Sequence, residues 1–183
     1  MIEMFLEKLS EKPSPKITKS ILIFSIILSI VVYFLMGYFF LLSKYPVGIV
    51  ESQLSFSGTI LKEHYKETNI EYYKIVQTLD YALMVGYGMF GFSLALIIAR
   101  KFEEGSRWRN SGYIVALLCV IAAICDAIEN AFILSTLTDP SGFPDIWAII
   151  HSCFALVKYI LLLSSIIWAI SGALTLLIKK LSS

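Results

Sequence analysis

Charged residues are scarce in this sequence. Of its 183 residues, only 16% are Asp, Glu, Lys or Arg, whereas 57% are hydrophobic. A soluble domain usually carries about a quarter of its residues as charged side chains, so the composition excludes an ordinary soluble domain. The net charge is +1, and the basic residues lie mainly beside the apolar runs. No dense basic patch is left to bind nucleic acid, which we therefore exclude as a partner.

The motifs of several common chemistries are missing as well. The sequence contains no Cys-x-x-Cys, no Gly-x-Ser-x-Gly, no His-Glu-x-x-His and no histidine pair spaced for haem on facing helices. We therefore predict neither a metal site nor a cofactor. The three cysteines, Cys119, Cys125 and Cys153, all fall in apolar runs. They are expected to be small packing residues.

What the sequence does have is four long apolar runs. A run of about 20 apolar residues is long enough to cross a bilayer as a helix, and the connections leave no room for a second domain. The sequence predicts an all-α membrane protein with one domain, residues 1–183, in which four transmembrane helices form an antiparallel bundle. The runs cover residues 21–43, 75–99, 112–137 and 146–178.

The basic residues predict the orientation of these helices. Ten of them flank the runs on one side of the membrane, and four lie on the other side. Because cytoplasmic flanks carry the excess of Lys and Arg, we predict a cell-membrane protein with both termini in the cytoplasm. Residues 1–20 are then a cytoplasmic segment and residues 44–74 an external one. The ten are Lys8, Lys12, Lys16, Lys19, Arg100, Lys101, Arg107, Arg109, Lys179 and Lys180.

The external segment contains a helix pattern of its own. Residues 57–67 begin with Ser57, a residue type that caps helix N-termini, and place Ile60, Leu61 and Tyr65 on one face. This pattern predicts a short amphipathic helix lying over the external end of the bundle. We expect it to act as a lid on any site beneath it.

Ionisable side chains interrupt the apolar runs. The third run carries Asp126, Glu129 and Asn130 within about 100° of arc on one helix face. A charged side chain at mid-bilayer costs at least a few kcal/mol, so such residues indicate a functional site with partners. The third and fourth runs are joined by a short turn and must form an antiparallel hairpin. Counting residues from that turn places Lys158 at the depth of Asp126, and His151 at the depth of Asn130.

The second run adds Asp80 and Tyr87, which share one helix side with Gln77. In the first run Ser25, Ser29, Tyr33 and Gly37 recur every fourth residue, which predicts the side that faces the bundle. Together these patterns predict a polar pocket in the outer half of the bilayer. The predicted lining is Tyr33, Asp80, Tyr87, Asp126, Glu129, Asn130, His151 and Lys158.

The charges of this pocket do not balance. Three carboxyl groups face one lysine, which we expect to pair with Asp126 or Glu129. Two negative charges remain if all the groups ionise, so protons or a cationic group should complete the site. The alternative is an ion pair that only fixes helix register, although apolar residues often replace such pairs without loss of stability.

Three functions fit this pocket. The first is binding of a membrane lipid or another small amphiphile with a cationic or hydrogen-bonding head, with or without coupling to protons. The second is an intramembrane enzyme that modifies a lipid, with a carboxyl group and Lys158 or His151 as acid and base. The third is a structural subunit, or a homo-oligomer, associating through small-residue faces such as Gly91-x-x-x-Ala95. Four spans with inward carboxylates are similar in architecture to sterol isomerases and the sigma-2 receptor, with no residue motif in common.

Overall fold

The computed structural model describes residues 8–182, which are mostly helical and contain no strand. Four helices are long and apolar enough to cross a membrane, which confirms the predicted fold class. Two short helices lie between the first and second of these. In chain order the helices are α2 (Pro15–Ser43), α3 (Ile49–Gln53), α4 (Gly58–Glu67), α5 (Ile70–Ala99), α6 (Arg107–Thr136) and α7 (Asp145–Leu181).

Side-chain caps fix where most of these helices begin. The hydroxyl or amide oxygens of Ser14, Ser57, Asn69 and Ser106 each accept a hydrogen bond from a backbone N–H in the first turn that follows. Such caps satisfy donors that the helix itself leaves free. Ser57 is the cap predicted from the sequence, and the predicted short helix between the first two spans is thereby confirmed as α4.

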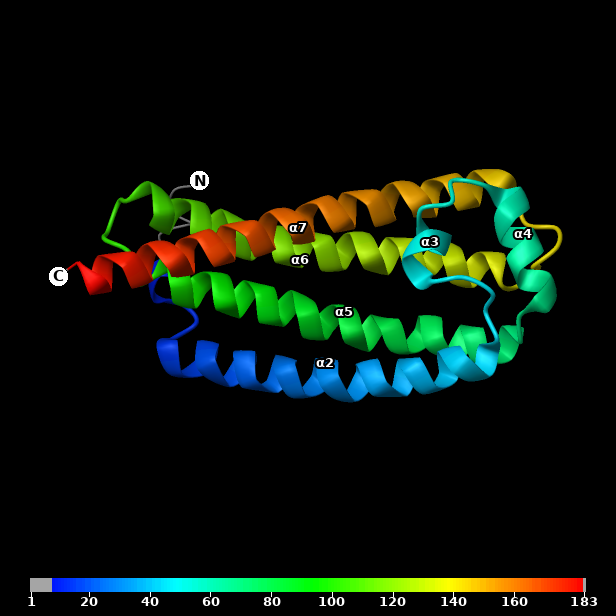
Figure 1. Cartoon of the computed structure of the whole chain (residues 1–183), viewed down its shortest axis with the longest axis horizontal. Coiled ribbons are helices and arrows are strands. Elements are labelled where there is room, and N and C mark those ends of the chain that lie inside the picture. Colours follow the sequence, from blue (N-terminus) through cyan, green and yellow to red (C-terminus); the bar gives the residue numbers. More distant parts are fainter. Residues whose placement is uncertain (1–7, 183) are drawn as a thin grey trace.

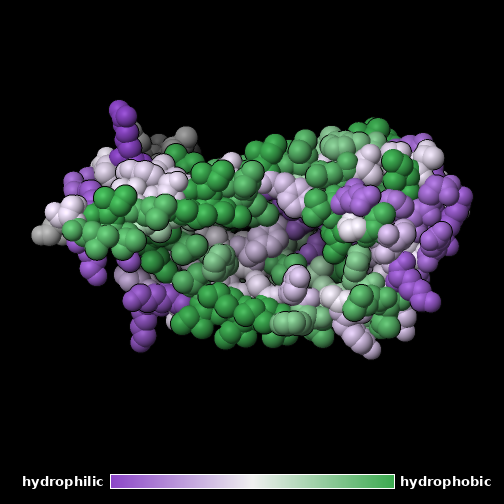
Figure 2. Space-filling model, viewed as in Figure 1, coloured by the Kyte–Doolittle hydropathy of each residue, from purple (hydrophilic) through white to green (hydrophobic). Residues whose placement is uncertain are grey.

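The four long helices form an open arc. Helix α2 packs on α5, α5 on α6 and α6 on α7, whereas α2 and α7 are not packed against each other. They lie at opposite edges of the arrangement in Figure 1, with α2 beginning and α7 ending at the same end of the molecule. Figure 2 shows hydrophobic side chains over the middle of the molecule and hydrophilic ones at both ends. The gap between α2 and α7 therefore faces the region that lipid would occupy.

Small residues let the neighbouring helices approach closely. A Cβ atom added to Gly112 of α6 would collide with Ala99 of α5 and Trp168 of α7. One added to Gly91 would collide with Cys119 of α6, and Ala95 is 2% exposed. The Gly91-x-x-x-Ala95 pattern is therefore used inside the arc, where it packs α5 on α6.

The segment between α2 and α5 folds back into the gap of the arc. Helix α3 lies between α4 and the middle of the molecule (Figure 1), and the Phe56 backbone N–H donates to Ser152 Oγ of α7 at 3.1 Å. Tyr45 holds this segment, since its ring stacks on Tyr73 of α5 at 4.3 Å and its hydroxyl lies 2.5 Å from Ser52 Oγ. The sequence patterns did not predict α3.

Helix α4 crosses the end of the bundle. Its Tyr65 hydroxyl lies 2.9 Å from Thr136 Oγ1 of α6, and Lys62 forms a 2.7 Å ion pair with Asp145 of α7. Burial raises the pKa of the Tyr45 and Tyr65 hydroxyls above the usual value for tyrosine, so both remain neutral. The segment between α2 and α5 is therefore tied to α5 and α6 by buried tyrosines and to α7 by the Lys62–Asp145 ion pair.

Candidate functional site

A buried lysine joins two acidic residues at the centre of the site. Lys158 Nζ of α7 lies 2.7 Å from Asp126 Oδ1 and 2.7 Å from Glu129 Oε2, both on α6. The three side chains are at most 4% exposed. Because Asp126 and Glu129 are three residues apart, they lie on the same face of α6 and can reach one partner. The predicted ion pair is confirmed, with both acidic residues as partners of the lysine.

Two further hydrogen bonds tie this cluster to α5. The Tyr87 hydroxyl donates to Asp126 Oδ2 at 2.7 Å. The Asn130 amide donates to Asp80 Oδ2 at 2.7 Å. Hydrogen bonds from Lys158 and Tyr87 therefore fix both oxygens of the Asp126 carboxylate, whereas Asp80 receives a bond on one oxygen.

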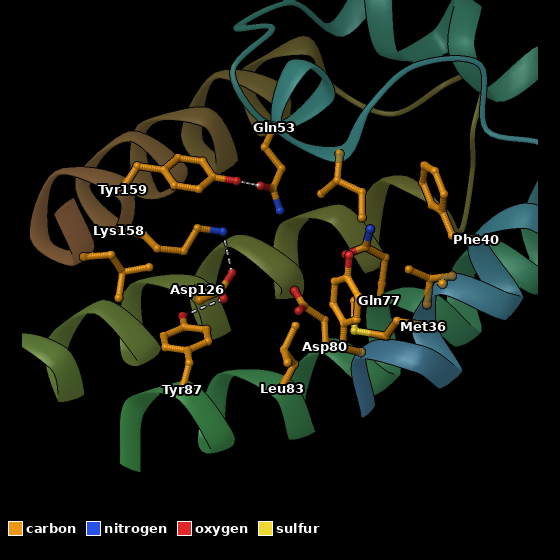
Figure 3. A pocket seen from close by; sticks show the side chains of 15 residues that line it. Met36, Phe40, Gln53, Gln77, Asp80, Leu83, Tyr87, Asp126, Lys158 and Tyr159 are labelled. Carbon is orange, nitrogen blue, oxygen red and sulfur yellow. Dashed lines mark hydrogen bonds and ion pairs between the residues drawn. The ribbon is translucent and has the colours of Figure 1, made fainter. Parts of the chain in front are cut away.

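A cavity of about 340 Å³ lies beside these groups, between α2 and α7. Figure 3 shows the Asp80, Asp126 and Lys158 side chains directed into it from α5, α6 and α7. Gln53 of α3 covers one side, where the Tyr159 hydroxyl donates a hydrogen bond to its amide oxygen. Figure 2 shows the hollow between α2 and α7, with hydrophilic residues at its base. The remaining lining residues are Tyr33, Met36, Gly37, Phe40, Ile49, Val76, Gln77, Leu83, Tyr87 and Leu162.

Buried acceptors in and behind the cavity lack donors. Gln77 Oε1, Asn130 Oδ1 and Glu129 Oε1 accept no hydrogen bond from any residue between 8 and 182. The 2.7 Å contact of Glu129 Oε2 with Lys158 is an ion-pair distance, although its direction is poor for a hydrogen bond. Leaving a buried acceptor unsatisfied costs about 1–3 kcal/mol. The site therefore favours a group that donates hydrogen bonds.

Four of the eight predicted site residues line the cavity from inside the arc: Asp80, Tyr87, Asp126 and Lys158. Glu129 and Asn130 lie behind this lining, fully buried and in contact with it. His151 is also buried, but it is not part of the lining, and neither ring nitrogen has a hydrogen-bond partner among the described residues.

Tyr33 lies on the rim of the cavity and is 67% exposed. The side of α2 that faces the bundle carries Ser25, Val32 and Met36, all of them buried. Tyr33 and Gly37 were predicted on that side, but both are exposed. The four-residue repeat is therefore right at Ser25 and at Ser29, which packs against Gly86 of α5, and wrong at Tyr33 and Gly37, because it drifts away from the buried stripe within two turns.

The cavity also contains polar residues that the prediction omitted. Gln77 shares a helix side with Asp80, so its position on α5 could have indicated it. Tyr159 follows Lys158 directly, and its ring centroid lies 4.8 Å from the lysine nitrogen. Gln53 could not be placed because nothing in the sequence indicates that α3 turns inward.

The predicted lid is α4, yet none of its residues lines the cavity. Ile49 and Gln53 of α3 do. The element that covers the site is therefore α3, and α4 crosses the end of the bundle and contacts α6 and α7.

Comparisons with protein-family models, curated proteins and solved structures gave no match to this chain. Within residues 8–182, no three His, Cys, Asp or Glu side chains are grouped to hold a metal ion. The geometry and charge of the cavity are therefore the features that indicate a function.

Proposed function

We propose that this protein binds a small amphiphile whose head group is cationic or donates hydrogen bonds, and that the head occupies the cavity between α2 and α7. The observation that carries the proposal is the surplus of acceptors around one cation. Asp80, Asp126 and Glu129 surround Lys158, which already contacts two of them. Gln77 and Asn130 add amide oxygens that accept no bond from the described residues.

The position of the cavity supports an amphiphile over a water-soluble ligand. Its opening lies between two helices that expose apolar side chains along most of their length, and α3 covers its external side. A ligand would therefore enter sideways from the bilayer. Binding sites for small molecules commonly combine an apolar lining with a few converging polar groups.

Replacing Asp80 by Asn tests the charge of the site. Asp80→Asn keeps the size of the side chain and an oxygen for the Asn130 amide. A hydrogen bond to a charged group contributes about 1.5–3 kcal/mol, so binding of hexadecylamine should weaken about ten- to a hundredfold. Hexadecanol binding should change little. Both are measured by titration of the protein in phosphatidylcholine nanodiscs.

The matched control is Glu71→Gln, which removes a carboxylate from the same helix at an exposed position outside the cavity. It should leave binding of the amine unchanged. Hexadecanoic acid should bind far more weakly than the amine, because its carboxylate would face Asp80 and Asp126. Equal binding of acid and amine, or an Asp80→Asn variant with full affinity for the amine, would refute the proposal.

A lipid-modifying enzyme is the second candidate, favoured by the chain of contacts from Tyr87 through Asp126 and Lys158 to Glu129. Such a chain can hold and transfer a proton beside a bound substrate. Turnover of a lipid extract by the wild type, abolished in Asp126→Asn, would support it. If the protein binds lipid without turnover, the enzyme is excluded and only the binding function remains.

We further propose that the protein lies in the cell membrane with both termini in the cytoplasm, as the distribution of basic residues indicates. Glu67 and Glu104 are exposed at opposite ends of the molecule. In intact cells, a membrane-impermeant maleimide should label Glu67→Cys and should leave Glu104→Cys unlabelled until the membrane is permeabilised. The opposite pattern would invert the orientation.

A further inference from the structure

An apolar groove adjoins the polar cavity. A second cavity of about 320 Å³ lies between α5 and α7, with α6 as its base. It shares Tyr87 and Leu162 with the polar cavity, so the two spaces lie side by side at these residues. From there it extends toward the end of the bundle at which α7 terminates. Its other lining residues are Phe90, Gly91, Leu94, Ala95, Val115, Cys119, Ser165, Ile166 and Ala169.

The groove has almost nothing with which to bind a polar group. Ser165 is the one hydroxyl beyond the junction, and it donates to the Leu161 carbonyl of its own helix at 2.8 Å. Along α5 the groove runs from Tyr87 to Ala95, about 12 Å at the helical rise of 1.5 Å per residue. It is therefore a long apolar extension of a site whose polar groups all lie at one end.

We propose that the ligand is a single-chain amphiphile, whose head lies among Asp80, Asp126 and Lys158 and whose unbranched hydrocarbon tail lies in the groove between α5 and α7. This inference depends on the proposed function, because it describes the same ligand. Each of the two cavities is near the lower end of the range that small ligands occupy, about 300–1,000 Å³. Their size fits one chain better than a two-chain lipid, and the junction at Tyr87 leads from head to tail.

A different apolar groove provides a comparison within the same protein. It has a volume of about 600 Å³ and lies over α5 and α6, and its lining includes Ile21, Met84 and Ala127. This comparison groove shares no lining residue with the polar cavity. Bilayer lipid should cover it without regard to the head group, so it distinguishes the specific tail site from general lipid contact.

The surrounding bilayer determines how tail length should affect binding. Lipid chains are as apolar as the groove, so moving a tail from lipid into the groove gains no hydrophobic free energy. Affinity should therefore not rise steadily with each added methylene. Selection should instead come from the match between tail and groove, with an optimum length.

Photo-crosslinking of two alkylamine probes tests this placement. One hexadecylamine carries a diazirine next to the amine, and the other carries it at the end of the tail. After irradiation in phosphatidylcholine nanodiscs and peptide mass spectrometry, the first should label residues around Asp126, and the second should label groove residues such as Val115, Leu94 or Ala169. Excess unlabelled hexadecylamine should suppress both.

Two alanine-to-phenylalanine variants test the groove itself. Ala169 lines it and is partly exposed, so Ala169→Phe fills the space without creating a buried clash. Overpacking should weaken hexadecylamine binding about tenfold or more and should spare octylamine, which shifts the optimum to shorter chains. Ala127→Phe fills the comparison groove in the same way and should leave both affinities unchanged.

The outcomes separate this inference from the proposed function. If the head probe labels the cavity but the tail probe labels the comparison groove or scattered surface residues, the tail placement is wrong and the proposed function stands. An Ala169→Phe variant with an unchanged length preference would contradict the placement too. If neither probe is suppressed by unlabelled amine, the cavity binds no amine and both proposals fail.

Discussion

Lys158→Met should lower the free energy of unfolding by about 3–5 kcal/mol, the range found when one partner of a buried ion pair is removed. The side chains of Lys158, Asp126 and Glu129 are at most 4% exposed, so the variant leaves two carboxyl groups buried without their cation. The matched control is Lys62→Met. It breaks an equally short but exposed ion pair with Asp145 and should cost about 0–1 kcal/mol. Unfolding in mixed micelles with increasing dodecyl sulfate measures both.

Because Lys158 also contacts Glu129, a second substitution at Asp126 alone should not fully restore the stability lost in Lys158→Met. Lys158→Met with Asp126→Leu still leaves Glu129 buried without its cation, so recovery should be partial. Adding Glu129→Leu removes the last charge of the Lys158, Asp126 and Glu129 cluster. Apolar replacement of all members of a buried ionic cluster is often neutral or stabilising. The triple variant should therefore recover most of the stability and lose amine binding. Full recovery in the double variant would mean that the Glu129 contact contributes little.

The sequence was sufficient to predict that Lys158 pairs with an acidic residue of α6, because the connection between α6 and α7 is short. A short hairpin fixes the relative depth of its two helices, so residues at similar distances from the turn lie at a similar depth in the bundle. Asp126 and Lys158 met this condition, and Glu129 joined them through helical spacing. The contact of Asp80 with Asn130 involves α5 and α6, whose connection, residues 100–106, looked longer in the sequence because the predicted apolar runs stop at residue 99 and resume at residue 112. Counting from a turn could not establish that contact.

The bundle-facing side of α2 could not be predicted in the same way. Lipid and helix interior are equally apolar, so apolar residues surround α2 on every side and their periodicity does not reveal which side is buried. The buried positions on the site's half of the helix, Val32 and Met36, are themselves apolar and give no contrast with their exposed neighbours. The inward fold of α3 was unpredictable for another reason. It depends on the contacts of Tyr45 with Tyr73, which is distant in the sequence, and with Ser52, a residue that belongs to no recognisable motif.

Tyr45→Ala should destabilise the protein by about 3–5 kcal/mol, as deletion of a buried aromatic side chain usually does. The ring is 7% exposed and stacks on Tyr73 at 4.3 Å, and its hydroxyl contacts Ser52 and His64. Ser52 is adjacent to Gln53, which covers the cavity, so loss of this anchor should also free α3. Hexadecylamine should then leave the site faster, which stopped-flow exchange against unlabelled amine would measure.

Two further tyrosine variants separate the ring from the hydroxyl and from tyrosine loss in general. Tyr45→Phe keeps the stack on Tyr73 and removes the hydroxyl, so it should cost about 0.5–1.5 kcal/mol and accelerate release only slightly. Tyr72→Ala removes a tyrosine that is 37% exposed near the same end of α5, and it should leave the release rate unchanged. If Tyr45→Ala unfolds more easily but releases the amine at the wild-type rate, α3 does not control exit, and the ligand leaves directly through the gap between α2 and α7. If Tyr45→Phe releases it as fast as Tyr45→Ala, the hydroxyl contact with Ser52, and not the aromatic stack, holds α3 over the cavity.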